Sequence, residues 1–583
     1  MADRSRYPLT IFHGQQYITI ICISSNLCSF LWANIYQIHF IEEKTYIPKI
    51  SILELTQMSF DDNDFWSFSQ NGPWVFPKDP PVWTKGLQEE RAKLKKEYKQ
   101  ILAASKLKAV SRLLQLFIYI GPPMLIWFFI DRKKPKTISR GLLAHRLRIA
   151  FQKLGPTYIK LGQIISSGEG IFPKELVTEF KLLRDQVPAE KFKIIKKIIR
   201  EELGQDIEEV FSYIDPKPIA AASIAQVHFA KLVTGEEVAV KVRRPKLETL
   251  VRNDLSVMDA IAPHLVGRIA IAALANPPAL VELFAETILE ELDFRLEAEN
   301  MLDVARVLAK SEKRAIIVPR PHPIFVTRGL LVMEKLSGFY FDEADKMRSA
   351  GIDTAKVLHQ GVVSFLEGVM LYGIFHGDLH GGNLFVQNDG KIALLDFGIT
   401  GRLDEDKRQA FLRLIIGAAM NDIANQVTAL QDLGAFPKDI DKEQIIKDLK
   451  LDTPGEDVTQ MSAEELTGQL KELTKQLLDY GAHIPKELML FIKNMLFLDS
   501  AVGNLAPDID IFEEFNSIAM YFVTHYGTYI TQQIGIDPDQ NAISTEGLKS
   551  SLGVSQDIDK LTYKDIQMRR DMVKKKFQAG EES

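Results

Sequence analysis

The stretch His376–Gly398 constrains this chain most, because it places polar side chains at fixed positions around two short apolar runs. The runs LFV and IALL are separated by the polar turn QNDG. Apolar runs joined by such a turn predict a short β-hairpin. Asp378 and Asp396 then stand just outside the ends of strands, where their carboxylates can converge.

The order of polar residues in this stretch is that of protein kinases. In those enzymes an HxD aspartate orients the attacking hydroxyl, an asparagine five residues later holds one Mg²⁺, and the DFG aspartate holds the other. Asp378, Asn383 and Asp396 stand in that order here. Mg²⁺ takes oxygen ligands and bridges nucleotide phosphates to one or two side chains. A DFG tripeptide alone would be an ordinary turn, but the whole series indicates a site that handles phosphoryl groups.

Composition narrows the class of protein. The 583 residues are 46% hydrophobic and 25% charged, as in ordinary globular chains, and leave room for about three to four domains. A net charge of -6 gives no general attraction to nucleic acid. Cys22 and Cys28 are the only cysteines, which excludes a cysteine-built zinc or disulfide framework and fits a reducing compartment.

Residues 1–57 form an apolar N-terminal segment unlike the rest. Tyr17–Ile41 is uncharged and long enough to span a bilayer, although serines and asparagines interrupt it. No small-residue cleavage site comes after it, so this is not a clean signal peptide. Two interpretations stay open: a membrane segment, or a mis-assigned start with translation beginning at Met58.

Residues 58–140 form an N-terminal region with a charged helical pattern over Leu87–Leu116 and an uncharged apolar stretch over residues 113–130. The Gly121-Pro122-Pro123 sequence in its middle argues against a straight spanning helix. Basic residues come directly after the stretch and suit an anionic lipid surface. We expect either a membrane-contacting or re-entrant hairpin, or a helix pair buried against the body.

Residues 141–211 are helical in pattern and end in an amphipathic helix. Within them, Lys160, Gly162 and Gln163 belong to the sequence KLGQ. On its own this would be a surface turn of a helix. It gains significance only in combination with motifs nearer the C-terminus.

A second hairpin is predicted around Thr234-Gly235, preceded by a loop of small residues: Ala220, Ala221, Ala222 and Ser223. Lys241 lies in its second strand, VAVKV. A lysine in an apolar strand is often a solvated edge residue. In a kinase-like nucleotide site it grips phosphates, and VAVK closely matches the VAIK pattern.

An anion is needed to hold Lys241, and the helical pattern Leu283–Ala309 offers Glu291, Asp293 and Glu297. Glu291 and Glu297 are six residues apart, about 600° around a helix, and so point to different faces. One of them can meet the lysine. A solvated charged face is the alternative.

The strand GLLVMEKLSG then leads to a connector between two lobes, where the backbone of Met333, Glu334 and Lys335 would meet an adenine ring. A plain buried strand would have the same pattern. Residues 405–530 are helical in pattern, and the charged tail from Lys560 is expected to fray.

With KLGQ, the alanine-rich loop, the ExD of residues 291–293 and the HGD, Asn and DFG series in this order, the chain resembles the UbiB (AarF) family of atypical protein-kinase-like ATPases. The resemblance is strong over Leu142–Phe411. It implies an α+β protein-kinase-like fold: a small N-lobe with an antiparallel sheet over residues 212–336, a larger helical C-lobe over 337–583, and an N-terminal helical KxGQ extension.

The resemblance also implies roles for single residues. The alanine-rich loop replaces the glycine-rich phosphate loop, and Lys241 contacts phosphates with Glu297 as its partner. Lys160 and Gln163 reach across the site toward Glu291 and Asp293. Asn383 and Asp396 hold Mg²⁺, while Asp378 positions a water or hydroxyl.

Departures from the kinase pattern matter too. Gly377 replaces the arginine of HRD, and no APE sequence comes after DFG, so an activation loop has no anchoring residue. Gly381 stands where other forms of the motif have proline, which leaves the ligands unchanged. His380 stands where many kinases place a lysine on the transferring phosphate. It either contacts a phosphate or only orders the loop.

Family members of this kind bind ATP with Mg²⁺ and support isoprenoid-quinone or related lipid metabolism. The expected partners are therefore a nucleotide, a membrane lipid or prenylquinone precursor, and a lipid-biosynthesis enzyme complex, with no nucleic acid, at the cytoplasmic face of a membrane. Protein kinase activity is doubtful, because the KxGQ helices cover the place of a peptide substrate. The alternatives are a small-molecule phosphotransferase and a nucleotide-gated scaffold without turnover.

Overall fold

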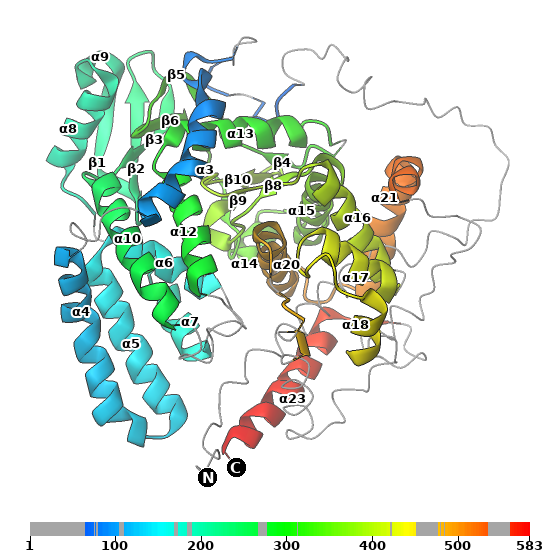
Figure 1. The fold of residues 1–583 in the computed structure, drawn as a ribbon. Helices are drawn as coiled ribbons and strands as arrows, with labels where there is room; N and C mark the ends of the chain where they lie inside the picture. The colour runs from blue at the N-terminus through cyan, green and yellow to red at the C-terminus, as the bar shows by residue number, and fades with distance from the viewer. Residues whose placement is uncertain are drawn as a thin grey trace, which may run out of the picture.

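The computed structural model describes residues 65–582, apart from 71, 75, 77–79, 104–109, 168–172, 184–188, 266–276, 312, 420–421, 450–475, 478–479, 483 and 535–559. The apolar segment 1–57, with its two interpretations, lies outside the described residues. Two lobes follow from the way the strands and helices are grouped (Figure 1).

An antiparallel five-stranded sheet in the order β1-β2-β3-β6-β5 forms the smaller lobe. Its strands are β1 (Phe211–Ala221), β2 (Ala225–Leu232), β3 (Glu237–Arg243), β5 (Pro321–Val326) and β6 (Leu330–Glu334). Val238, Val240 and Val242 of β3 are buried in one cluster with the helix α8 (Phe192–Leu203). Because side chains alternate along a strand, Lys241 points to the opposite face.

The predicted single helix over Leu283–Ala309 is wrong. The chain forms α12 (Pro277–Glu291) and α13 (Phe294–Leu308), separated by a break at Asp293. The carboxylate of Asp293 accepts a hydrogen bond from the Arg295 backbone N–H at 3.1 Å, which makes it the N-cap of α13. The angle computed along one continuous helix therefore does not apply.

The larger lobe begins with short strands. In the mixed sheet β4-β10-β9-β7, the strands are β4 (Ile316–Ile317), β7 (Phe339–Tyr340), β9 (Leu384–Val386) and β10 (Ile392–Leu394). The antiparallel pairing of β9 with β10 confirms the hairpin, and its turn ends at Gly390 with φ 83°. Beyond DFG, β11 (Thr400–Arg402) pairs with β8 (Ile374–His376), so the chain returns to the strand that leads into the HxD segment.

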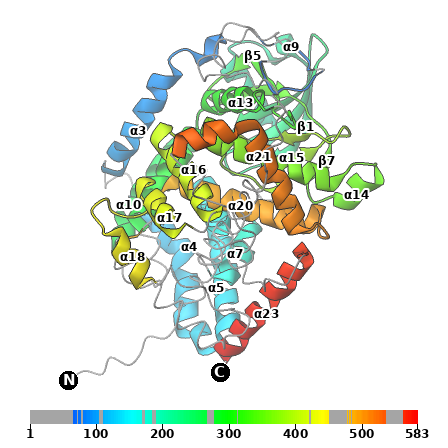
Figure 2. The ribbon, with the colours of Figure 1, turned by 90° about the vertical axis from the view of Figure 1, so that its right-hand side faces the viewer.

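Helices fill the rest of this lobe, as predicted for the described part of residues 405–530. They are α14 (Ala344–Ser349), α15 (Thr354–Glu367), α16 (Glu405–Ala419), α17 (Ile423–Asp432), α18 (Lys442–Asp448), α20 (Lys486–Leu505), α21 (Ile511–Ile534) and α23 (Tyr563–Glu582), with a π-helical turn at Gly368–Tyr372. Figure 2 shows α16, α17, α20 and α21 together on one side of the lobe.

The expectation of a frayed tail is wrong for its first part. Tyr563, the first residue of α23, is buried, and Arg570 forms an ion pair with Asp499 of α20 at 2.7 Å. The charges of this segment are therefore used in packing against α20.

The N-terminal helices are α3 (Leu87–Ala103), α4 (Val110–Phe129), α5 (Lys136–Leu154), α6 (Pro156–Ser167), α7 (Lys174–Lys181), α9 (Ile207–Val210) and α10 (Leu247–Leu265). The predicted break in residues 113–130 is wrong, because α4 continues through Pro122 and Pro123. Each proline forfeits one backbone hydrogen bond, and the bonds on either side hold the helix.

The helix α4 is neither a re-entrant hairpin nor part of a buried pair. It packs against α5, and none of its residues is buried. By length and composition, Val110–Lys133 and α20 are each long and apolar enough to cross a membrane. The α20 helix lies partly inside the larger lobe, which accounts for its apolar residues.

Candidate active site

Lys241 joins the two lobes at the centre of the site. Its Nζ lies 2.6 Å from Oε1 of Glu297 on α13 and 3.2 Å from Oδ1 of Asp396. Burial would lower the pKa of Lys241, but the charges of Asp396 and Glu297 outweigh it and raise the pKa above its ordinary value. The ammonium therefore stays charged and available to an anionic ligand.

Glu297 is buried beside this lysine. Burial raises its pKa, and Lys241 only partly offsets the effect. Of the two carboxylates beside Lys241, Glu297 therefore takes up a proton before Asp396 as the pH falls.

Asp396 is held in a left-handed backbone conformation, with φ 57°, and its carboxylate accepts a hydrogen bond from the Gly398 N–H at 3.3 Å. Burial would raise its pKa, but Lys241 and Lys160 lower it to about 2. Its side chain remains 48% exposed. The result is an ionised, accessible carboxylate, and a non-glycine residue at positive φ often marks a functional site.

His376 ties the HxD and DFG segments together. Its Nδ1 accepts from the Asp378 N–H at 3.1 Å, and its Nε2 lies 2.8 Å from the carbonyl oxygen of Asp396. Burial lowers the pKa of His376, so the ring is neutral and carries its proton on Nε2. One buried imidazole thereby fixes the backbone next to both aspartates.

Asn383 lies beside the same segment. Its amide Nδ2 donates to the Asp378 carbonyl at 3.1 Å, and its own carbonyl accepts from the Leu395 N–H at 2.8 Å. The side chain of Asn383 is thus held at Asp378, and its backbone lies next to Leu395, the residue before Asp396.

The fit to Mg²⁺ can be tested on these residues. Within the described residues there is no group of three or more His, Cys, Asp or Glu side chains able to hold a metal ion. One carboxylate and one amide oxygen are nevertheless what Mg²⁺ takes from a protein when nucleotide phosphates and waters supply the other ligands. Asp396 and Asn383 therefore fit Mg²⁺ bound together with a nucleotide, and do not fit a metal held by protein alone.

Asp378 contacts a residue that the motifs did not indicate. Its Oδ1 accepts a hydrogen bond from the ammonium of Lys493 on α20. Burial would raise the pKa of Asp378, but Lys493, His380 and Lys160 hold it far below its usual range. The neighbouring Asn494 is fully buried and binds the backbone of His376 and Leu379. No sequence signal joins α20 to a loop that lies 115 residues earlier.

The KxGQ residues close the site from the other side. Lys160 on α6 pairs with Glu291 at 2.6 Å, as the resemblance implied. The implied reach toward Asp293 is wrong, because Asp293 pairs with Arg295 at 2.7 Å and with Arg328 at 3.3 Å. Its carboxylate is used in capping α13 and in these two ion pairs.

The two hydrogen bonds described for Gln163 go to residues other than Glu291 and Asp293. Its Nε2 donates to the Leu183 carbonyl at 3.2 Å, and its Oε1 accepts from the Ser223 hydroxyl at 3.3 Å. A Cβ on Gly162 would collide with the side chain of Leu183, so glycine allows α6 to approach the segment that comes after α7. The KxGQ sequence thus joins α6 to the small-residue loop.

The predicted loop over residues 220–223 is shorter than expected. Ala220 and Ala221 end β1, and the turn into β2 begins at Ala222, whose N–H donates to the Ala225 carbonyl at 2.8 Å. Ser223 is buried in this turn.

At the connector, Met333 pairs with Ala239 of β3. The buried side chain of Glu334 accepts from the Arg320 N–H at 3.2 Å, and Lys335 pairs with Glu237 at 3.1 Å. The side chains of Glu334 and Lys335 are thus engaged in structure, the Glu334 N–H donates to the Arg320 carbonyl at 2.9 Å, and the backbone contact with an adenine ring stays a prediction.

His380 begins the short turn before Asn383, where its Nδ1 accepts from the Gly382 N–H at 3.2 Å. It therefore orders the loop, while a phosphate contact stays a prediction.

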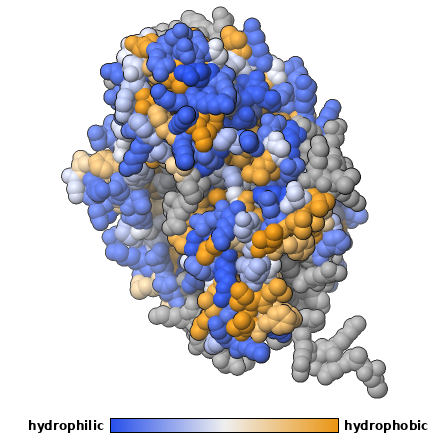
Figure 3. Space-filling view, turned by 90° about the vertical axis from the view of Figure 1, so that its left-hand side faces the viewer, coloured by the Kyte–Doolittle hydropathy of each residue, from blue (hydrophilic) through white to orange (hydrophobic). Residues whose placement is uncertain are grey.

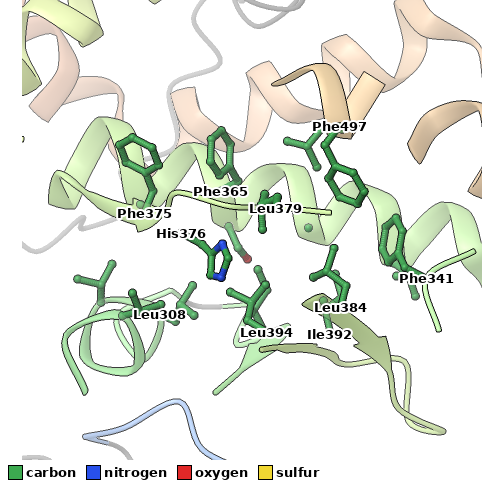
Figure 4. Close-up of a pocket in the computed structure, with 18 of the residues that line it drawn as sticks. Leu308, Phe341, Phe365, Phe375, His376, Leu379, Leu384, Ile392, Leu394 and Phe497 are labelled. Carbon is green, nitrogen blue, oxygen red and sulfur yellow. The ribbon is translucent and has the colours of Figure 1, made fainter. Parts of the chain in front are cut away.

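Behind the HxD segment lies an apolar cavity of about 50 Å³. Figure 4 shows the ring of His376 on its wall, with Phe365, Leu384 and Phe497 around it. Ser364 also lines this cavity, and its buried hydroxyl has no hydrogen-bond partner in the described part of the chain.

Taken together, fold and site define an atypical kinase-like protein: two lobes, a lysine paired with a helix glutamate, and an HxD, Asn and DFG series. The sequence profile of the ABC1 atypical kinase-like domain matches residues 182–430. The chain belongs to this ABC1 family, which includes AarF-domain and UbiB proteins.

Several relatives are similar over about two thirds of this chain. An uncharacterised Mycobacterium tuberculosis protein is 36% identical over 65% of this chain and 78% of its own length. An uncharacterised aarF domain-containing protein kinase, chloroplastic, of Arabidopsis thaliana is 32% identical over 65% and 75%. The probable protein kinase UbiB of Pseudomonas fluorescens is 31% identical over 67% and 72%.

Among solved structures, the complex of Rv3197 with erythromycin from Mycobacterium tuberculosis covers 59% of this chain and 91% of that chain. Its sequence identity is 18% and the TM-score is 0.34.

Proposed function

We propose that this protein binds Mg-ATP and transfers the terminal phosphoryl group to water or to a small molecule. The observation that carries the proposal is the position of the Lys241 ammonium between Glu297 and Asp396. Such a lysine is held ready for nucleotide phosphates, next to an ionised aspartate that can take a metal.

The residues divide the work. Asp396 and Asn383 would hold Mg²⁺, which neutralises charge on the phosphates when it is bound. Lys241 orients the phosphates, and the alanine-rich turn approaches them as backbone. Asp378 orients the attacking hydroxyl or water. Because its pKa is held so low, it acts in the resting site by position and charge and does not take up a proton.

A small acceptor is favoured over a peptide. The α6 helix reaches the site through the Lys160–Glu291 pair, and Glu291 lies against Gly398 of the DFG sequence. The chain after DFG pairs as β11 with β8, so it offers no long activation segment on which a peptide could bind. Phosphoryl transfer to a protein side chain would need both elements to move.

We further propose that the acceptor or client process is isoprenoid-quinone, ubiquinone-type, or related lipid biosynthesis, at the cytoplasmic face of a membrane. The support is the family and the surface of α4. Large hydrophobic side chains are exposed along this helix: Leu114, Phe117, Ile118, Leu125, Phe128 and Phe129. Figure 3, in which the left-hand side of Figure 1 faces the viewer, shows hydrophobic residues gathered over the lower part of the molecule.

The way α4 is attached favours lying along the membrane over crossing it. The neighbouring α5 carries Arg140, Arg146 and Arg148, and such charges are costly inside a bilayer. Arg112, near the start of α4, contacts the buried Asp254 of α10 and holds the helix to the body. An apolar helix at the interface, with basic residues after it, binds anionic lipid peripherally.

The test is phosphate release by the purified full chain with Mg-ATP, with and without anionic liposomes carrying phenolic quinone precursors. We expect turnover that the additives stimulate and that the Asp396→Asn variant loses. Unaltered turnover in that variant would refute the assigned site. Nucleotide binding without any turnover would favour a nucleotide-gated scaffold instead.

A further inference from the structure

Lys493 is a charged residue of the site that the motifs do not include. It lies on α20, in the interior of the larger lobe, and its side chain is 21% exposed. Its ammonium contacts Oδ1 of Asp378, whose side chain is 22% exposed. Both side chains are therefore partly accessible to a ligand.

The backbone around Lys493 fixes its position. The adjacent Asn494 is fully buried, donates to the His376 carbonyl and accepts from the Leu379 N–H at 3.0 Å. These two bonds fasten α20 to both sides of Asp378. Because Lys493 directly precedes Asn494 on this helix, its backbone is held close to the HxD loop.

Other charged groups of the site lie near Asp378. Lys160 acts electrostatically on both Asp378 and Asp396, and Asp378 acts on Asp396, so the two aspartates lie near each other. Lys241 forms ion pairs with Asp396 and Glu297. Lys493 is the corresponding cation for Asp378. It is at the end of the site where the group to be transferred must meet the attacking oxygen.

We propose that Lys493 is a phosphate-binding residue: its ammonium contacts Asp378 in the nucleotide-free protein and binds the γ-phosphate when Mg-ATP is present. This inference rests on the proposed function. It supplies from α20 the positive charge that many kinases place two residues after the HxD aspartate, a position occupied here by His380. An ammonium that can rotate between two oxygen anions suits this exchange.

The experiment compares Mg-ATP and Mg-ADP affinities of the full chain by calorimetric titration. Lys493→Met should weaken Mg-ATP binding by about 10- to 100-fold, the value of a charge-assisted hydrogen bond, and Mg-ADP binding by less than about threefold. Lys493→Arg should keep most of the preference for ATP. A role limited to holding the loop would weaken both nucleotides alike and would overturn the proposal.

A matched control lies on the same helix. Lys486 is two turns before Lys493 and pairs with Glu286 at 3.3 Å. Lys486→Met should leave both affinities unchanged. If Lys493→Met behaves like Lys486→Met, the γ-phosphate contact is refuted.

A double variant separates direct contact from neutralisation of Asp378. If Lys493 acts only by cancelling the charge of Asp378, Asp378→Asn will restore the ATP affinity of Lys493→Met, and this result overturns the proposal. If the ammonium touches the phosphate, the double variant will still bind Mg-ATP weakly.

Asp396→Asn separates a failure of the proposed function from a failure of the Lys493 proposal. If Asp396→Asn still binds Mg-ATP, the proposed function is refuted. If Asp396→Asn loses Mg-ATP binding but Lys493→Met leaves the affinity unchanged, only the role of Lys493 is refuted.

Discussion

Asn494 offers the sharpest test of how the active-site loop is held. Its amide satisfies two buried backbone groups, the carbonyl of His376 and the N–H of Leu379. Asn494→Ala would leave both without a partner, in a place where the asparagine side chain has no exposure to water. Each unpaired buried group costs about 1–3 kcal/mol, so the variant should lose about 3 kcal/mol of unfolding free energy after the small gain in helix propensity.

The measurement is the urea midpoint of the full chain, together with hydrogen exchange at the Leu379 amide. About 3 kcal/mol corresponds to an exchange rate roughly 100-fold faster at that amide if local opening controls it. Mg-ATP affinity should fall as well, because the backbone beside Asp378 loses its anchor.

Asn504 near the end of the same helix is the matched control. Its amide makes one hydrogen bond, to the Phe341 carbonyl at 3.1 Å, in a partly exposed place. Asn504→Ala should cost less than about 1 kcal/mol. If Asn494→Ala costs no more than Asn504→Ala and leaves exchange at Leu379 unchanged, α20 does not anchor the loop and the reasoning fails.

Three further outcomes are expected. Gly162→Ala should lower the free energy of unfolding in urea by about 1–3 kcal/mol, because the added Cβ would collide with Leu183. The control Gly121→Ala on α4 meets nothing within 4 Å and should be neutral or stabilising; equal effects of the two variants would contradict the tight approach of α6. Ser364→Ala should raise the unfolding free energy by about 1 kcal/mol, because it removes an unpartnered buried hydroxyl, and a loss would mean that the hydroxyl is satisfied. Burial lowers the pKa of His322 to about 4, so the stability due to its neutral ring is complete above about pH 6.5 and is lost as the pH falls through 4. His322→Gln should remove about 2 kcal/mol of this acid sensitivity in thermal melts between these pH values, and parallel curves would refute it.

Local pattern was sufficient for much of this fold. Period-two alternation in β3 placed Lys241 opposite the buried valines, and the glycine turn of the β9–β10 hairpin was readable from its residues. The pairing of Lys241 with Glu297 came from the family resemblance, and the structure brings the two groups to 2.6 Å. Such features depend on neighbours in sequence or on a motif of fixed order.

The errors arose where local patterns compete. Asp293 looked like one more charge on a helix, but an aspartate can end one helix and cap the next, and its carboxylate is then used by backbone and arginines. The prolines of α4 suggested a break that the flanking helical turns override. Lys493 and Asn494 carry no motif at all, because their roles come from the packing of α20 on a distant loop.

The charges of the site explain why a metal and a nucleotide should enter together. Four carboxylates converge with three ammonium groups: Glu291, Glu297, Asp378 and Asp396 with Lys160, Lys241 and Lys493. Every ammonium is already paired, so a triphosphate alone would add negative charge to a site with an excess carboxylate. Mg²⁺ held by Asp396 would reverse this balance and would free Lys241 for the phosphates. Because these ion pairs already occupy the three ammonium groups, we expect nucleotide binding to depend on the metal.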